Sequence, residues 1–96
     1  DDGVTIHWLI PNAQKKDIEP ILVTIQPGAE TETDLPHMGE EFGYVLSGAV
    51  TLELGGKNYR VRKGDSFSFK PSQQHDLKNT GKTPATVLWV CTPPNF

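Results

Sequence analysis

The chain has 96 residues, of which 35% are hydrophobic and 22% are charged, a composition typical of one globular domain and not of a disordered segment. Its net charge of −3 argues against the basic face with which DNA-binding domains hold phosphates. A single cysteine excludes an internal disulfide, and no apolar run reaches the ~20 residues of a membrane span. We therefore expect a cytoplasmic domain without membrane contact.

Short strands joined by turns are predicted along most of the chain, because glycine and proline are spread through it. The polar segment 12–19 is bracketed by Pro11 and Pro20 and predicts a loop with at most one helical turn. The predicted strands cover 4–10, 21–26, 42–48, 49–56, 57–64, 65–70, 75–79 and 84–92. Eight or nine short strands at such intervals predict an all-β sandwich or barrel.

One hairpin and one central strand are predicted in more detail. Adjacent Gly55 and Gly56 predict a tight turn between 50–54 and 58–62, with the apolar residues of both strands on one face. The segment 84–92 is the most apolar strand and is predicted to be central.

Three residues are candidates for a metal site: His37, Glu41 and His75. Two imidazoles and one carboxylate can bind a transition metal on one side and leave positions open for a ligand. The alternative is an ordinary loop histidine and a strand carboxylate that bind no metal.

The first of two motifs in the chain resembles a motif of the cupin superfamily, which has the form G-x5-H-x-H-x3-E-x6-G. His37, Glu41 and Gly48 match its second histidine, its glutamate and its closing glycine in register. Leu35 stands where the motif has its leading histidine. The resemblance therefore implies a site with one ligand fewer than usual.

The second motif, G-x5-P-x-G-x2-H-x3-N, is matched by Gly64, His75 and Asn79, with Pro71 displaced by one residue and Ser72 at the inner glycine. The resemblance implies a small antiparallel jelly-roll barrel over the whole chain, 1–96. It also implies that His37, Glu41 and His75 hold a divalent transition metal (zinc, iron, nickel or manganese), unless the barrel is empty. The residues expected to line a ligand pocket are Leu35, Tyr44, Phe67 and Phe69.

A narrower resemblance rests on the runs GEEFGYVLSG, GDSF and VLWV-x-TPP. They resemble the C-terminal cupin domain of XRE-type helix-turn-helix transcriptional regulators, a group that includes the putrescine-responsive regulators. The resemblance implies one cupin domain from a longer regulator, which contacts DNA only through an N-terminal domain that this chain lacks.

The function implied is sensing of a small-molecule effector by a homodimer, without catalysis. The acidic stretch 30–41 favours a cationic effector, and the apolar runs 4–10 and 21–26 are expected as edge-strand dimer surfaces. Two alternatives stay open. One is a stand-alone metal-dependent cupin enzyme, an oxygenase or isomerase, and the other is a structural dimerisation module with an empty barrel.

Overall fold

The structure is a computed structural model that describes residues 3–10, 17–31, 39–70 and 73–93. Within these residues the chain forms eight strands and no helix that could cross a membrane. In chain order the strands are β1 (Val4–Trp8), β2 (Glu19–Ile25), β3 (Glu40–Ser47), β4 (Ala49–Leu54), β5 (Lys57–Arg62), β6 (Ser66–Phe69), β7 (His75–Lys78) and β8 (Ala85–Thr92).

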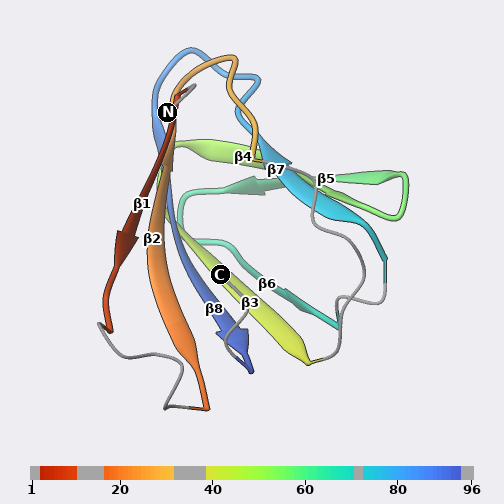
Figure 1. Cartoon of the computed structure of the whole chain (residues 1–96). Helices are drawn as coiled ribbons and strands as arrows, with labels where there is room; N and C mark the ends of the chain where they lie inside the picture. Colours follow the sequence, from red (N-terminus) through yellow and green to blue (C-terminus); the bar gives the residue numbers. More distant parts are fainter. Residues whose placement is uncertain (1–2, 11–16, 32–38, 71–72, 94–96) are drawn as a thin grey trace.

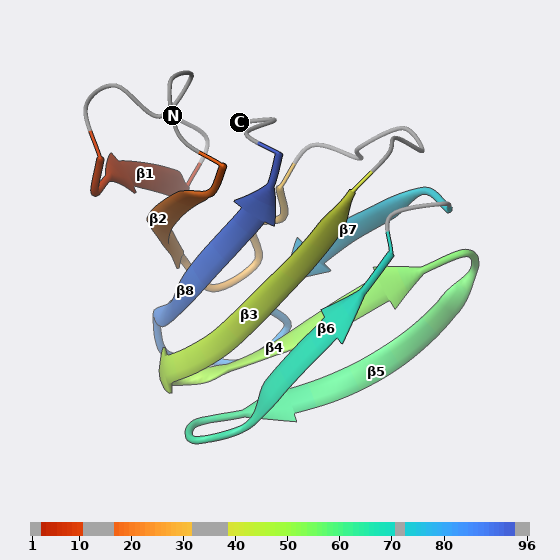
Figure 2. The same cartoon turned by 90° about the horizontal axis from the view of Figure 1, so that it is seen from below.

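The strands form two antiparallel sheets that face each other (Figure 1). The five-stranded sheet has the order β1-β2-β8-β3-β6, and the three-stranded sheet has the order β5-β4-β7. Figure 2 shows how β3 turns into β4 and so links the two sheets at one end. The prediction of an all-β fold of eight or nine short strands is confirmed.

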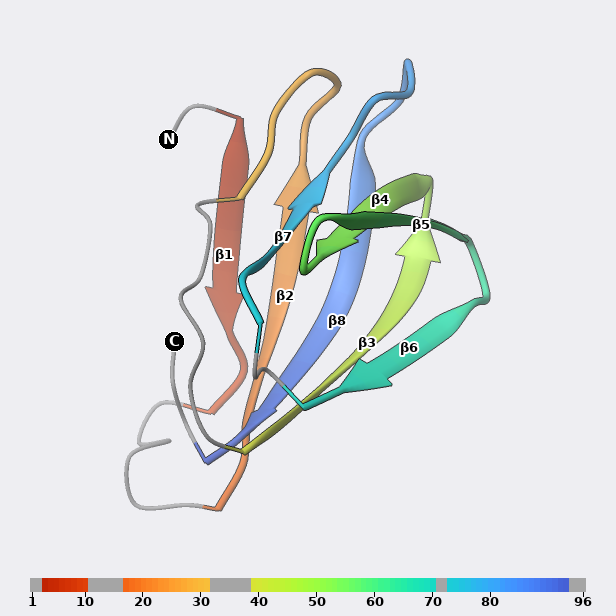
Figure 3. The ribbon, with the colours of Figure 1, turned by 90° about the vertical axis from the view of Figure 1, so that its right-hand side faces the viewer.

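The strand β8 is central, as predicted, because it pairs with β2 on one side and with β3 on the other. Its residues alternate between buried and half-buried, as do those of β2. Since β2 lies between β1 and β8, the expectation that 21–26 forms an edge strand is wrong. The strand β1 does form the edge of its sheet (Figure 3).

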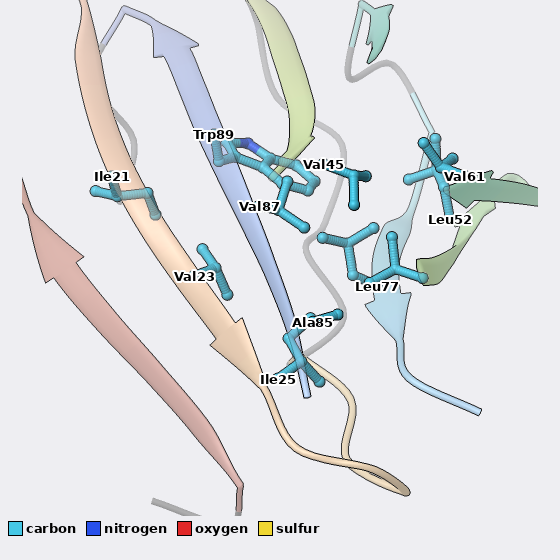
Figure 4. Close-up of a cluster of buried hydrophobic side chains, with 11 residues drawn as sticks. Ile21, Val23, Ile25, Val45, Leu52, Val61, Leu77, Ala85, Val87 and Trp89 are labelled. Atoms are coloured by element: carbon cyan, nitrogen blue, oxygen red, sulfur yellow. The ribbon is translucent and has the colours of Figure 1, made fainter. Parts of the chain in front are cut away.

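The core lies between the inner faces of the two sheets (Figure 4). Val45 of β3 and Val87 of β8 point from the five-stranded sheet toward Leu52 and Leu77 of the other, and all four are at most 3% exposed. Burial of each such aliphatic side chain contributes about 1.5–3 kcal/mol. This packed apolar layer therefore holds the two sheets together.

The predicted hairpin is confirmed as β4 and β5. Gly55 and Gly56 have φ angles of 57° and 84°, the pair of positive values that a type I′ turn needs. The register pairs Val50 with Val61 and Leu52 with Tyr59, so the apolar side chains share one face.

Candidate ligand and metal site

Glu41 lies inside the barrel because alternate residues of β3 face the core. Its side chain, like that of Val45 further along the strand, is buried, and the residue is only 1% exposed. The indole Nε1 of Trp89 on β8 donates a hydrogen bond of 2.6 Å to the carboxylate Oε1. The central strand of the sheet thus fixes the orientation of this carboxylate.

His75 brings an imidazole from the opposite sheet to the same place. It is the first residue of β7 and is 2% exposed. Its Nε2 lies 3.1 Å from Glu41 Oε2, and its Nδ1 lies 3.0 Å from the backbone oxygen of Gln73. Because a carbonyl oxygen can only accept, we assign a proton to Nδ1. Nε2 is then the nitrogen that faces the carboxylate.

The separation of these two donors fits a shared metal ion. Two ligands about 2.1 Å from one ion, at angles of about 90–110°, lie roughly 3.0–3.4 Å apart. The 3.1 Å between His75 Nε2 and Glu41 Oε2 falls in that range. A hydrogen bond from the other ring nitrogen to a backbone carbonyl is also common among metal-binding histidines.

The third predicted ligand, His37, lies outside the described residues, as does Leu35 of the expected pocket. Within the described ranges, no three residues among His, Cys, Asp and Glu form a group that could hold a metal. The structure therefore brings together two of the three predicted ligands, Glu41 and His75.

The same two residues can also make a contact without metal. A proton on His75 Nε2 gives a buried imidazolium that donates to the Glu41 carboxylate. A metal ion and this proton compete for the same lone pair. The pair can thus act as a metal ligand set or as a structural ion pair, and the donor chemistry suits both.

A cavity of about 500 Å³ opens between the strands β4, β5 and β6. Its walls are mostly apolar or aromatic, and they include Phe67 and Phe69, which the sequence places in a ligand pocket. Tyr44, expected in the same lining, instead lies on the outer face of β3 with 37% of its surface exposed. The cavity is lined by Leu52, Leu54, Tyr59, Arg60, Val61, Asp65, Ser66, Phe67, Ser68 and Phe69.

Aromatic contacts join this cavity to the Glu41–His75 pair. The ring of Phe69 meets the imidazole of His75 edge to face, with 5.0 Å between centroids, and Phe67 meets Trp89 in the same manner at 5.4 Å. A molecule in the cavity would therefore touch the side chains that pack against the pair.

Gly43 is a site residue that the sequence analysis missed. It pairs with Phe67 across β3 and β6, and a Cβ on Gly43 would lie 2.1 Å from the Phe67 ring. The missing side chain lets the Phe67 ring approach β3 this closely. A glycine inside a strand pattern is the available signal, because it often marks such a close approach.

Asn79, the last residue of the second motif, has a structural role. Its side chain is buried, and its Nδ2 donates to the backbone oxygens of Ile25 and Thr83, at 2.8 Å each. Its Oδ1 accepts from the Gly81 amide at 2.9 Å. These bonds fix the turn before β8 and so the position of the central strand.

The sequence was compared with known protein families. Residues 21–91 match the cupin domain. The chain belongs to the cupin family. Glu41 and His75, which meet inside this barrel, both lie within the matched range.

Relatives of this cupin domain include regulators. It is 29% identical over 94 residues to the HTH-type transcriptional regulator PuuR of Escherichia coli strain K12, which covers 98% of this chain and 51% of the regulator. The chain thus spans about half the length of that relative. The crystal structure of a cupin domain of an XRE family transcriptional regulator from Enterobacter cloacae has the same fold, with a TM-score of 0.85, 18% identity and coverage of 97% and 99%.

An enzyme is also among the similar structures. A sugar phosphate isomerase of the cupin superfamily from Silicibacter pomeroyi is 29% identical, with a TM-score of 0.83, over 95% of this chain and 60% of the isomerase.

Proposed function

We propose that this cupin domain is the small-molecule-sensing and dimerising part of a transcriptional regulator, and that its effector binds in the cavity beside the Glu41–His75 pair. The observation that carries the proposal is the contact of Phe69 with both the cavity and His75. An effector there would change the packing around the buried Glu41–His75 pair, which links the two sheets. The similarity to a helix-turn-helix regulator supports the regulatory part.

The proposed effector is a small organic cation. The walls offer the aromatic faces of Tyr59, Phe67 and Phe69, which attract ammonium groups, and the carboxylate of Asp65. Arg60 also belongs to the lining, but its guanidinium reaches out to Thr80 Oγ1 at 3.5 Å.

A thermal shift titration tests this proposal. Putrescine or spermidine should raise the melting temperature, whereas 1,4-butanediol, which has the same carbon chain as putrescine but no charge, should not. A ligand at a hundred times its dissociation constant stabilises by about 2.7 kcal/mol, which is readily measured. No shift at millimolar diamine would contradict the cationic effector.

A matched pair of variants locates the binding site. Phe69→Leu removes an aromatic face from the cavity, and Phe42→Leu makes the same change on the outer face of β3, where the side chain is 39% exposed. We expect only Phe69→Leu to reduce the shift. Equal losses in both variants would place the ligand elsewhere.

We further propose that His37, Glu41 and His75 bind a divalent transition metal. The donor types and the 3.1 Å between Glu41 Oε2 and His75 Nε2 support this. When bound, the ion would supply positive charge and open positions for an oxygen or nitrogen donor of a ligand. Glu41 would accept from Trp89 in either state and hold its orientation.

The second candidate function is a metal-dependent isomerase, favoured by the 29% identity to the sugar phosphate isomerase. Incubation of metal-loaded protein with a panel of sugar phosphates, followed by NMR, distinguishes the two functions. Turnover that is lost in His75→Ala would support the enzyme. Binding of a diamine without turnover would support the sensor.

A further inference from the structure

The positive charges of this chain are concentrated in one part of it. Seven of its nine lysine and arginine residues lie between positions 57 and 82, and this segment contains two carboxylates, Asp65 and Asp76. Asp76 is 3% exposed, whereas six of the seven cations are exposed. The net charge of −3 is therefore the average of a basic segment and an acidic remainder. The seven cations are Lys57, Arg60, Arg62, Lys63, Lys70, Lys78 and Lys82.

Strand alternation places the two arginines of β5 on the outer face of the three-stranded sheet. Val61, which lies between them in sequence, is 5% exposed and faces the core. Arg60 and Arg62 therefore point outward, about 6.6 Å apart along the strand. The register pairs them with Thr51 and Ala49 of β4, which have short, uncharged side chains.

Lys63 extends this row of cations in a turn of fixed shape. Its backbone amide donates to the oxygen of Gly48 at 3.0 Å. Asp65, the exposed carboxylate of the basic segment, accepts a hydrogen bond of 2.9 Å from the backbone amide of Arg62. The carboxylate thus stabilises the turn through the main chain, and the guanidinium group of Arg62 stays available for another anion.

The turn between β7 and β8 brings a further cation to the same side. The Nη1 of Arg60 lies 3.5 Å from the Oγ1 of Thr80, so this turn is within reach of the outer face of β5. Lys82, two residues after Thr80, is exposed.

The acidic side chains near this face lie beside Lys78 of β7. The carboxylate of Glu53 is 3.6 Å from the Lys78 amine, and Glu30 forms a β-bridge with the same lysine. Within the part of the chain that the structure describes, Arg60 and Arg62 form no ion pair with a carboxylate. The charge of the arginines is therefore not neutralised by these acids.

From this distribution we infer that a basic edge, formed by Arg60, Arg62, Lys63 and Lys82, binds the phosphate backbone of double-stranded DNA. Guanidinium and ammonium groups are the usual partners of phosphates. The inference rests on the proposed regulatory function, which places this domain near DNA. It adds a contact made by the sensor domain itself to the one expected from an N-terminal domain.

The surroundings of the arginines favour a nucleic acid over a protein partner. Protein interfaces are usually centred on large apolar or aromatic side chains. On the outer face next to Arg60 and Arg62 lie Ala49, Thr51 and Asn58, which are small or polar. Such a surface provides charge and hydrogen bonds to an anionic backbone but no apolar anchor, so the contact should not depend on base sequence.

Fluorescence anisotropy of a labelled duplex of about 20 base pairs, titrated with the chain, tests the inference. We expect a dissociation constant of about 10–100 µM at low salt. The logarithm of the affinity should fall with the logarithm of the salt concentration by about 0.9 for each phosphate contact. No binding at about 500 µM chain in low salt would overturn the inference.

A charge-matched pair of variants locates the contact. Arg62→Gln/Lys63→Gln should weaken binding at low salt by about tenfold or more and reduce the salt slope by about two. Thr5→Glu/His7→Glu lowers the net charge equally on exposed β1, on the opposite side of the barrel (Figure 2), and should leave the slope unchanged. Equal changes in both variants would show a general charge effect and overturn the basic edge.

Lys82→Gln is a separate variant for the case in which the double variant does not fold, and it should reduce the slope by about one. Displacement of the duplex by poly-glutamate at equal charge concentration would overturn the choice of DNA in favour of an acidic protein. The variants leave Arg60, which also lines the cavity, unchanged. Since no effector or metal is needed, a failure here is distinguishable from a failure of the sensing proposal, which the thermal shift reports.

Discussion

The carboxylate of Glu41 and the imidazole of His75 meet at 3.1 Å inside the barrel, although they come from different sheets and from distant parts of the chain. Both residues are at most 2% exposed. The contact links the five-stranded sheet to the three-stranded sheet through polar atoms. Its disruption should therefore affect stability as well as ligand binding.

Replacement of Glu41 by leucine should lower the free energy of unfolding by about 3 kcal/mol, the usual cost of removing one partner of a buried pair. Glu41→Gln should cost far less, since the amide oxygen can still accept from Trp89 and the amide nitrogen can donate to His75 Nε2. Urea denaturation of both variants measures the difference. Equal costs would show that the hydrogen bonds of this carboxylate contribute little.

The response to metal should distinguish Glu41→Gln from the wild-type protein. We expect wild-type protein to be stabilised by added zinc, nickel or manganese and to lose that gain in a chelator, because the ion binds only the folded state. Glu41→Gln lacks an anionic ligand and should show little metal-induced shift at nearly native basal stability. Metal analysis by mass spectrometry gives an independent readout, and an undiminished metal content in Glu41→Gln would count against the site.

Gly43→Ala should push the Phe67 ring away from β3, since the added Cβ would lie 2.1 Å from a ring atom. Overpacking of this kind typically costs about 1–3 kcal/mol. A double-mutant cycle with Phe67→Ala tests the cause. In the Phe67→Ala background the alanine at 43 has room, and its cost should largely disappear; an unchanged cost would point to the backbone instead.

Asn79→Ala should destabilise the domain by about 2 kcal/mol or more, because it leaves backbone groups of Ile25, Gly81 and Thr83 without a hydrogen bond that each now makes. Asn58→Ala is the matched control on exposed β5 and should be nearly neutral. Equal effects of the two changes would refute the structural role assigned to Asn79.

Much of the fold follows from local patterns. Alternation of apolar residues identified the strands, and the glycine pair at 55 and 56 identified the hairpin, because both signals depend only on neighbours in sequence. The observed strand boundaries differ from the predicted ones by a few residues. For example, β2 begins at Glu19 and not at position 21. The interior position of β2 depends on pairing with distant strands, which no local pattern encodes.

For the candidate site, too, local patterns predicted some features, whereas others depend on pairing between distant strands. Strand alternation places Glu41 inside, and the same alternation places Tyr44 outside, so the two expectations for β3 were inconsistent with a regular strand. The contact of Glu41 with Trp89 and the closeness of Gly43 to Phe67 depend on the register of β8 and β6 against β3. Register between strands distant in sequence cannot be read from spacing alone.

The strand β3 has one face toward the interior of the barrel and the other on the outer surface. Glu41 and Phe42 are consecutive residues, yet one side chain touches His75 in the interior and the other lies on the outer surface. Their Cα atoms are joined through one rigid peptide plane. Any shift of β3 that lengthens the Glu41–His75 contact must move Phe42 by a similar amount, so the inside of the barrel and its outer surface are mechanically one element.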